Sequence, residues 1–235
     1  NINFFVDISD VSPTPANLTL KAGPVTTTGG QFSNQSFVFG IPEDLTVSVI
    51  DGIANFDNVE VYEGSFLSQT YVYSTRNKFQ KFILPNVGID LDSLVVTVRP
   101  SIDSSVTTKY SRQDDLFDND TKTTITRNSN IYFIQEVESE QYEVIFGDGV
   151  FGKALEDGNV IEMTYIVTNG SDGNGINSFT FSGSVSYVRN SVEIFVTNGI
   201  SLVSSVLPSS GGESIESTES IRKFAPQVYT TQNRA

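Results

Sequence analysis

The chain contains no cysteine and no histidine among its 235 residues. Without cysteine it can form no disulfide, offers no thiol nucleophile and builds no cysteine metal site, which suits a protein made in a reducing compartment. Without histidine it lacks the usual general base and the commonest zinc ligand. Ser-His-Asp and Cys-His catalysis are therefore excluded. Carboxylate chemistry, Lys or Tyr chemistry and oxygen-ligated calcium remain open.

Positive charge is scarce, with 14 Lys and Arg against 28 Asp and Glu and a formal net charge of −14. A field of that sign repels nucleic-acid phosphate and anionic lipid. Apart from Arg222-Lys223 the basic residues are scattered singly, so no basic patch compensates. We therefore expect no nucleic-acid partner.

Long apolar runs are also missing. No stretch approaches the roughly 20 residues needed to span a bilayer, and no basic start followed by an apolar core marks a signal peptide. We therefore expect no membrane insertion. The chain opens with Asn1 and its only methionine is Met163, so we expect a fragment or a processed product of a longer protein.

The chain is rich in aromatic residues and in segments where apolar and polar residues alternate. Its 17 Phe and 9 Tyr can build real cores although the apolar fraction is only 38%. Apolar residues recur with a period of two, most clearly in 59–63 and 142–146, as in antiparallel sheets with one wet face. We predict a mainly β protein of antiparallel, sandwich-like sheets. The expected strands are 36–40, 45–50, 58–63, 69–74, 81–84, 94–99, 123–126, 130–136, 141–146, 160–168, 178–182 and 192–198.

The length suggests one or two domains. Residues 101–120 are polar and short of apolar side chains, so we expect a joint or a long loop there. The prediction is a β-rich domain at 1–105, with an extended connector at 12–16, and a second β-rich domain at 106–235.

One short helix is expected near the C-terminal end of the chain. Ser210 can act as its N-cap with Glu213 three residues on, and Pro226 stops it. Its apolar stripe is thin, so the helix has to pack on the β domain or on another chain. The candidate interface residues are Ile215, Ile221, Arg222, Phe224, Pro226 and Arg234. Deleting residues 211–235 is expected to leave a folded but less associated protein.

The stretch 142–158 resembles a phosphate loop and fails each test for one. Gly147 to Lys153 fits the P-loop spacing, but the next residue is Ala154, which has no hydroxyl for magnesium. A dinucleotide fold needs a helix after the glycines, whereas a strand-like run begins at Val160. A kinase needs motifs that the chain lacks. We expect a hairpin turned by Asp148-Gly149, and no cofactor. The structural turn residues are Gly147, Asp148, Gly149, Gly152 and Gly158.

Clustered carboxylates offer the remaining routes to chemistry. A calcium loop at Asp114, Asp115, Asp118 and Asp120 would lack the glycine and terminal glutamate of an EF-hand. Glu136, Glu138, Glu140 and Glu143 fit the wet faces of a hairpin better than a glycosidase pair, and the chain has no tryptophan to stack on a sugar. Lys153 could hold an anion, but we expect it instead to snorkel or to pair with Glu156 or Asp157 at the surface. We predict no catalytic residue, no metal site and no enzyme; a carboxylate enzyme would require a carboxyl of strongly raised pKa in a cleft.

Three ordered segments together carry a family resemblance. The first is Phe146-Gly-Asp-Gly-Val-Phe-Gly-Lys-Ala-Leu-Glu-Asp-Gly158, followed by Met163-Thr-Tyr165 and Asn169-Gly-Ser-Asp-Gly-Asn174. The second is Gly211-Gly-Glu-Ser-Ile-Glu-Ser217 with Ile221-Arg-Lys-Phe-Ala-Pro226 and Thr231-Gln-Asn-Arg-Ala235. These resemble the signature of the baseplate J-like family. Upstream, Val61-Tyr-Glu-Gly64, Phe82-Ile-Leu-Pro-Asn86 and 90–98 resemble baseplate wedge proteins of T-even-type contractile-tailed bacteriophages.

The resemblance covers most of the chain from about position 60 onward and implies a structural role. Members of the family are virion proteins that pair and link wedges into a ring around the tail tube, and they have no catalytic residues. The expected partners are a second copy of this chain and other baseplate wedge proteins, with assembly in the host cytoplasm. Two other readings stay open: a tail-associated β module that binds host glycan, and a carboxylate enzyme.

Overall fold

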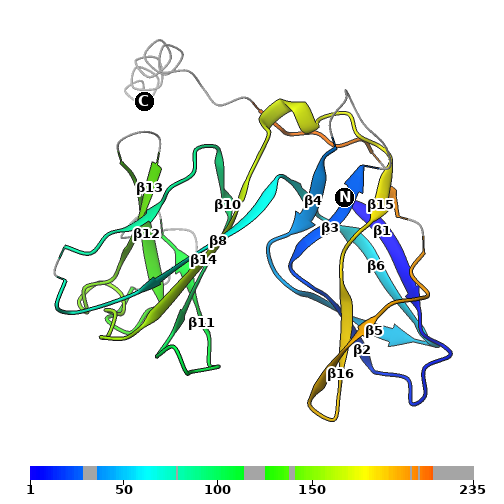
Figure 1. Cartoon of the computed structure of the whole chain (residues 1–235), viewed down its shortest axis with the longest axis horizontal. Helices are drawn as coiled ribbons and strands as arrows, with labels where there is room; N and C mark the ends of the chain where they lie inside the picture. Colours follow the sequence, from blue (N-terminus) through cyan, green and yellow to red (C-terminus); the bar gives the residue numbers. More distant parts are fainter. Residues whose placement is uncertain are drawn as a thin grey trace, which may run out of the picture.

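The computed structural model describes residues 1–28, 36–77, 79–113, 125–137, 141–201, 203–205 and 207–213. Their regular secondary structure is almost entirely β-strand, in mainly antiparallel sheets, which confirms the predicted fold class. Among them the one helical segment is the 3-10 turn η2 (Gly170–Gly173), and no helix is long and apolar enough to cross a membrane. Figure 1 shows two β bodies side by side.

The first body, here called the terminal body, contains both the first and the last described strands. Its seven-stranded sheet has the order β17 (Val192–Val196), β16 (Val185–Arg189), β2 (Asn17–Leu20), β5 (Leu45–Ile50), β6 (Ile53–Val59), β1 (Ile2–Asp7) and β18 (Ser204–Ser205). A four-stranded sheet has the order β15 (Phe179–Phe181), β3 (Gly23–Thr28), β4 (Val38–Ile41) and β7 (Tyr62–Glu63).

One hydrophobic core joins these two sheets as a sandwich. Alternate residues of β1, such as Phe4, lie buried on the inner face, and Phe4 stacks on Phe56 with 4.6 Å between ring centroids. Val25 and Ile41 of the smaller sheet belong to the same buried cluster. The alternation read from the sequence is thus the alternation of a sheet with one covered face.

The second body, here called the inserted body, is one seven-stranded sheet that nearly closes into a barrel. Its order is β8 (Ser65–Val72), β14 (Val160–Val167), β10 (Ile89–Arg99), β11 (Thr108–Arg112), β12 (Ile131–Val137), β13 (Gln141–Phe146) and β9 (Phe82–Leu84). All its pairs are antiparallel except β11 with β12. The hydroxyl of Tyr71 in β8 donates to the carbonyl of Ile83 in β9 at 2.6 Å, which links the two edges.

The inserted body begins and ends at one place. Ser65 and Val167, its first and last strand residues, are paired across β8 and β14. The preceding Gly64 has φ of 144°, and a Cβ there would lie 2.5 Å from Ile166 Cγ2, so glycine alone fits this close entry. The bodies therefore do not divide at the expected boundary of 105/106, because β10 before it pairs with β11 and β14 after it.

The expected strands agree with the structure where alternation is regular. Residues 45–50 and 141–146 match β5 and β13 in full. The strand expected at 58–63 is interrupted: Asn58 has φ of 56°, β6 ends one residue later, and Tyr62–Glu63 form the separate strand β7. The loop expected at 101–120 contains β11, and β1, β2, β3 and β16 were not predicted. Apart from Glu213, the helix expected at 213–226 lies outside the described residues, which end at 213.

Candidate functional site

The glycine loop, residues 147–158, crosses one end of the inserted body. The hairpin expected at Asp148-Gly149 is not formed, because β13 pairs with β12 and β9 whereas β14 pairs with β10 and β8. The loop therefore connects two strands that are not neighbours in the sheet. No helix follows it; the chain continues directly into β14.

Glycine is required at several positions of this loop. Gly149, Gly152 and Gly158 have φ of 87°, 85° and 86°, the left-handed region that side chains rarely adopt. Gly147 forms an isolated bridge with Ala154. A Cβ on Gly147 would lie 2.3 Å from the carbonyl carbon of Gly152, so the two backbone segments touch there. The glycines therefore lie in a tight loop between non-neighbouring strands, and the hairpin expected from them is absent.

The backbone amides of residues 149–153 donate to acceptors within the protein. The carboxylate of Asp148 accepts the backbone N–H of Val150 at 2.8 Å and of Phe151 at 2.9 Å. These two hydrogen bonds hold the pKa of Asp148 below its usual value, and the bond from Phe151 has the larger effect. The N–H of Gly149 donates to the carbonyl of Gly152 at 3.0 Å. A phosphate cradle needs free amides that point to a common centre, and here these amides already have acceptors.

Neighbouring segments fix the loop in place. The amides of Gly152 and Lys153 donate to the carbonyls of Thr126 and Ser129, at 3.1 and 2.8 Å. The side chain of Lys153 forms no ion pair with any residue that the structure describes, so the pairing expected with Glu156 or Asp157 is not seen.

Two further loops are tied to the same end of the barrel. Asp157 Oδ1 accepts the amide of Thr75 at 2.8 Å and its hydroxyl at 3.1 Å, in the loop after β8. The bond from the Thr75 amide is the main reason that the pKa of Asp157 is lowered. Asn159 Nδ2 donates to the carbonyl of Pro100, where the loop after β10 begins. In Figure 1 these loops lie at the end of the inserted body that is away from η2.

Each of these three loops exposes large apolar side chains. The exposed fractions are 91% for Phe79, 71% for Ile102, 65% for Val106, 66% for Val150 and 50% for Phe151. We call these five residues the apolar tip. An apolar residue exposed alone is ordinary, but several gathered on one end mark a surface suited to contact.

The charge at this end differs from that of the chain as a whole. The segments 73–81, 100–107, 125–130 and 147–158 carry five basic and four acidic residues, against a net charge of −14 for the chain. The segments that carry the apolar tip are thus nearly neutral, so their own charge adds little to the repulsion of a second negatively charged protein.

A cavity of about 850 Å³ lies where the two bodies meet. Phe39 and Phe179 are part of its wall, which also includes the carboxylates of Glu60, Glu63, Asp90, Asp92 and Glu213. Burial, followed by the negative charge of Glu60, raises the pKa of Tyr62 in the same wall. Among the residues that the structure describes, no group of three or more His, Cys, Asp or Glu is placed to hold a metal ion.

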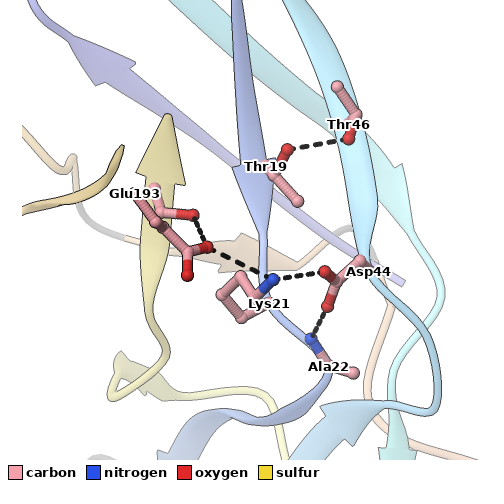
Figure 2. Close-up of polar contacts among 7 residues, drawn as sticks. Thr19, Lys21, Ala22, Asp44, Thr46 and Glu193 are labelled. Carbon is pink, nitrogen blue, oxygen red and sulfur yellow. Dashed lines mark hydrogen bonds and ion pairs between the residues drawn. The ribbon is translucent and has the colours of Figure 1, made fainter. Parts of the chain in front are cut away.

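The outer face of the terminal sheet carries one charged cluster, drawn in Figure 2. Lys21 Nζ contacts Asp44 Oδ2 and, at 3.3 Å, Glu193 Oε1, which also accepts the hydroxyl of Ser186 at 2.8 Å. The hydrogen bond to Asp44 is the main cause that raises the pKa of Lys21. Lys21 therefore stays protonated and is a poor nucleophile; the cluster instead ties β17 to β2.

The remaining predicted residues are distributed as follows. The candidate interface residues Ile215, Ile221, Arg222, Phe224, Pro226 and Arg234 lie outside the described residues, as do Asp114, Asp115, Asp118, Asp120, Glu138 and Glu140. Glu143 forms an ion pair with Lys81 at 3.2 Å. The carboxyl groups with displaced pKa values in the described part of the chain are Asp7, Asp148, Asp157 and Glu193, and all four are lowered.

Sequence reasoning missed all five residues of the apolar tip. For Phe79, Ile102 and Val106 a usable signal was present, since each is a large apolar residue isolated within a polar turn segment and so has no strand face to occupy. Neither the models of known protein families nor the curated proteins with which the chain was compared give a match.

Proposed function

We propose that this chain is a structural subunit of the baseplate of a contractile bacteriophage tail, where it associates with copies of itself and with other wedge proteins. The resemblance of residues 146–174 to the baseplate J-like family motivates the proposal. The observation that carries it is the construction of the glycine loop: its backbone is fixed by hydrogen bonds while Val150 and Phe151 are presented to solvent.

A fixed apolar loop suits assembly more than catalysis. Ordering costs are low when a contact surface is already held in its bound conformation, so more of the burial energy appears as affinity. Phe151 and Phe79 are exposed aromatic side chains of the kind that interfaces favour near their centre. The nearly neutral segments that carry them add little to the repulsion between two chains of net charge −14.

The test is the mass of the protein by light scattering across a concentration range. The parent mass should rise with concentration, and the double variant Val150→Ser, Phe151→Ser should associate about tenfold more weakly, as expected for loss of a buried aromatic anchor. Ile50→Ser is the matched control, since Ile50 is 68% exposed on β5 of the other body. A parent mass that stays at 25.7 kDa throughout contradicts self-association.

The place in the virion is tested separately. Antibodies raised against the chain should label the baseplate of contractile-tailed particles under negative-stain electron microscopy. Label on heads, on fibres or on no particle would contradict the baseplate role even if the isolated chain associates.

A second candidate is glycan binding by a tail-associated module. The observation that favours it is the open cavity between the bodies, where Tyr62 and several carboxylates offer hydroxyl-binding groups. A glycan array should then give ligands whose binding falls in Tyr62→Phe and Glu60→Gln. An array without a ligand removes this candidate.

A further inference from the structure

Strand β17 (Val192–Val196) is a free edge of the terminal sheet. In the described part of the chain it pairs with β16 alone. It carries no proline and no lysine, the residues that commonly protect an edge from another chain. Val192 and Phe195 are 59% and 54% exposed. The edge is thus apolar, accessible and unprotected.

The turn before β17 determines which backbone groups face outward. Asn190 and Ser191 have φ of 52° and 63°, as in the two-residue hairpins whose flanking residues are hydrogen-bonded to each other. The hydrogen-bonded pair is therefore Arg189 and Val192. Bonded and non-bonded pairs alternate along an antiparallel ladder, so Ile194 also bonds to β16. Glu193 and Phe195 direct their N–H and C=O groups away from β16. Outside the strand ladder, no hydrogen bond in the described part of the chain uses these four groups.

We propose that a second copy of this chain adds to this edge, β17 against β17, antiparallel about a twofold axis at Ile194. This rests on the self-association in the proposed function and adds a second contact to it: the β17 edge forms the twofold pair, whereas the apolar tip contacts further copies in the ring. Val192 to Val196 is symmetric about Ile194, so Glu193 of one copy exchanges both backbone bonds with Phe195 of the other. Two such pairs satisfy all the outward groups of both edges.

Charge favours a second copy at this register. Glu193 lies opposite an uncharged phenylalanine, so no carboxylates are directly opposed, which would be unfavourable. Its charge is already countered by Lys21 at 3.3 Å and hydrogen-bonded by Ser186. Figure 2 shows this carboxylate turned toward Lys21. An axis at Glu193 would instead place the two carboxylates face to face.

The absence of cysteine gives a direct test in the full chain. A single cysteine at the proposed axis, Ile194→Cys, can form only an intermolecular disulfide. Opposed residues that are not hydrogen-bonded lie about 4.5 Å apart at Cα, within the range that a disulfide spans. Under mild oxidation Ile194→Cys should run mostly as a covalent dimer, whereas the control Val188→Cys, 70% exposed on the same hairpin, should stay mostly monomeric. Equal cross-linking of the two variants, or none, overturns the pairing.

Phe195→Pro supplies a second variant. Proline removes an outward N–H without removing a bond to β16, so the fold should be retained while association weakens by about tenfold or more. Phe195→Leu keeps both the amide and an apolar side chain and should associate like the parent. Circular dichroism of each variant checks folding; if Phe195→Pro is unfolded, the disulfide experiment decides alone.

The outcomes separate this inference from the proposed function. If the parent mass rises with concentration but Ile194→Cys does not cross-link, the edge pairing is wrong and the assembly role stands. If the parent stays monomeric at every concentration and no variant cross-links, both the pairing and the self-association fall.

Discussion

At the scale of single residues, the glycine loop depends on backbone contacts that tolerate no side chain. Gly147→Ala should destabilise the protein by about 1–3 kcal/mol, since its Cβ would meet the backbone of Gly152 at 2.3 Å. Gly158→Ala is the matched control, because nothing lies within 4 Å of a Cβ at this position. The alanine would then lose only the energy needed to hold its backbone at φ of 86°, about 1 kcal/mol. Urea unfolding measures both. Equal losses would show that the close contact carries no energy.

The carboxylate of Asp148 predicts a pH dependence at the same scale. Its pKa is lowered in the folded protein, so its contribution is present above the unfolded value of about 3.9 and is lost as pH falls through the lower folded value. Asp148→Asn should therefore flatten the loss of stability on acidification, with urea midpoints compared at neutral and acidic pH. Asp103→Asn, which removes a carboxyl at an exposed position outside the glycine loop, is the matched control.

The exposure of the apolar tip and the pairing of β13 could not be predicted from single residues, because both depend on the whole fold. The left-handed backbone at Gly149, Gly152 and Gly158 is a local property that glycine permits, so a glycine-rich stretch can indicate it without knowledge of the fold. Which strands pair is a non-local property, so β13 and β14 were read as neighbours although three strands lie between them. The exposure of Phe79 likewise depends on how the finished barrel places its loops.

At the scale of elements, strands were predictable where alternation was uninterrupted. Residues 45–50 and 141–146 alternate cleanly and were placed to the residue. β3 was missed because Gly-Pro-Val-Thr-Thr-Thr reads as a polar turn, yet Thr26 is fully buried between neighbouring strands. Tertiary packing overrides local preference there.

The Lys21 cluster joins elements and predicts an effect at alkaline pH. Because its folded pKa is raised, the contribution of Lys21 is present below the unfolded value of about 10.4 and is lost as pH rises through the folded one. Lys21→Met should cost at most about 1 kcal/mol near neutral pH, since the partners are partly exposed, and the difference from the parent should shrink above that value. Lys109→Met, whose pair with Glu43 is more exposed, should cost less. Urea unfolding across pH tests both.

At the scale of the whole molecule, the inserted body should fold on its own. Residues 64–168 contain every strand of the nearly closed sheet and a complete buried cluster, and their ends are adjacent. Expressed alone, this segment should give a β-type circular dichroism spectrum and a cooperative thermal transition. The segments 1–105 and 106–235 should not, since each cuts a sheet. Cooperative unfolding of those two, without that of 64–168, would contradict this organisation.

The pairing of Ser65 with Val167 also determines how the molecule bears mechanical load. Tension applied to residues 1 and 213 passes first through β1 and β18, which are paired near the chain ends. The chain enters and leaves the inserted body through one two-stranded neck, so the force along the backbone does not reach this body until the terminal sheets unzip. A protein built this way can yield in one half while the other keeps its shape.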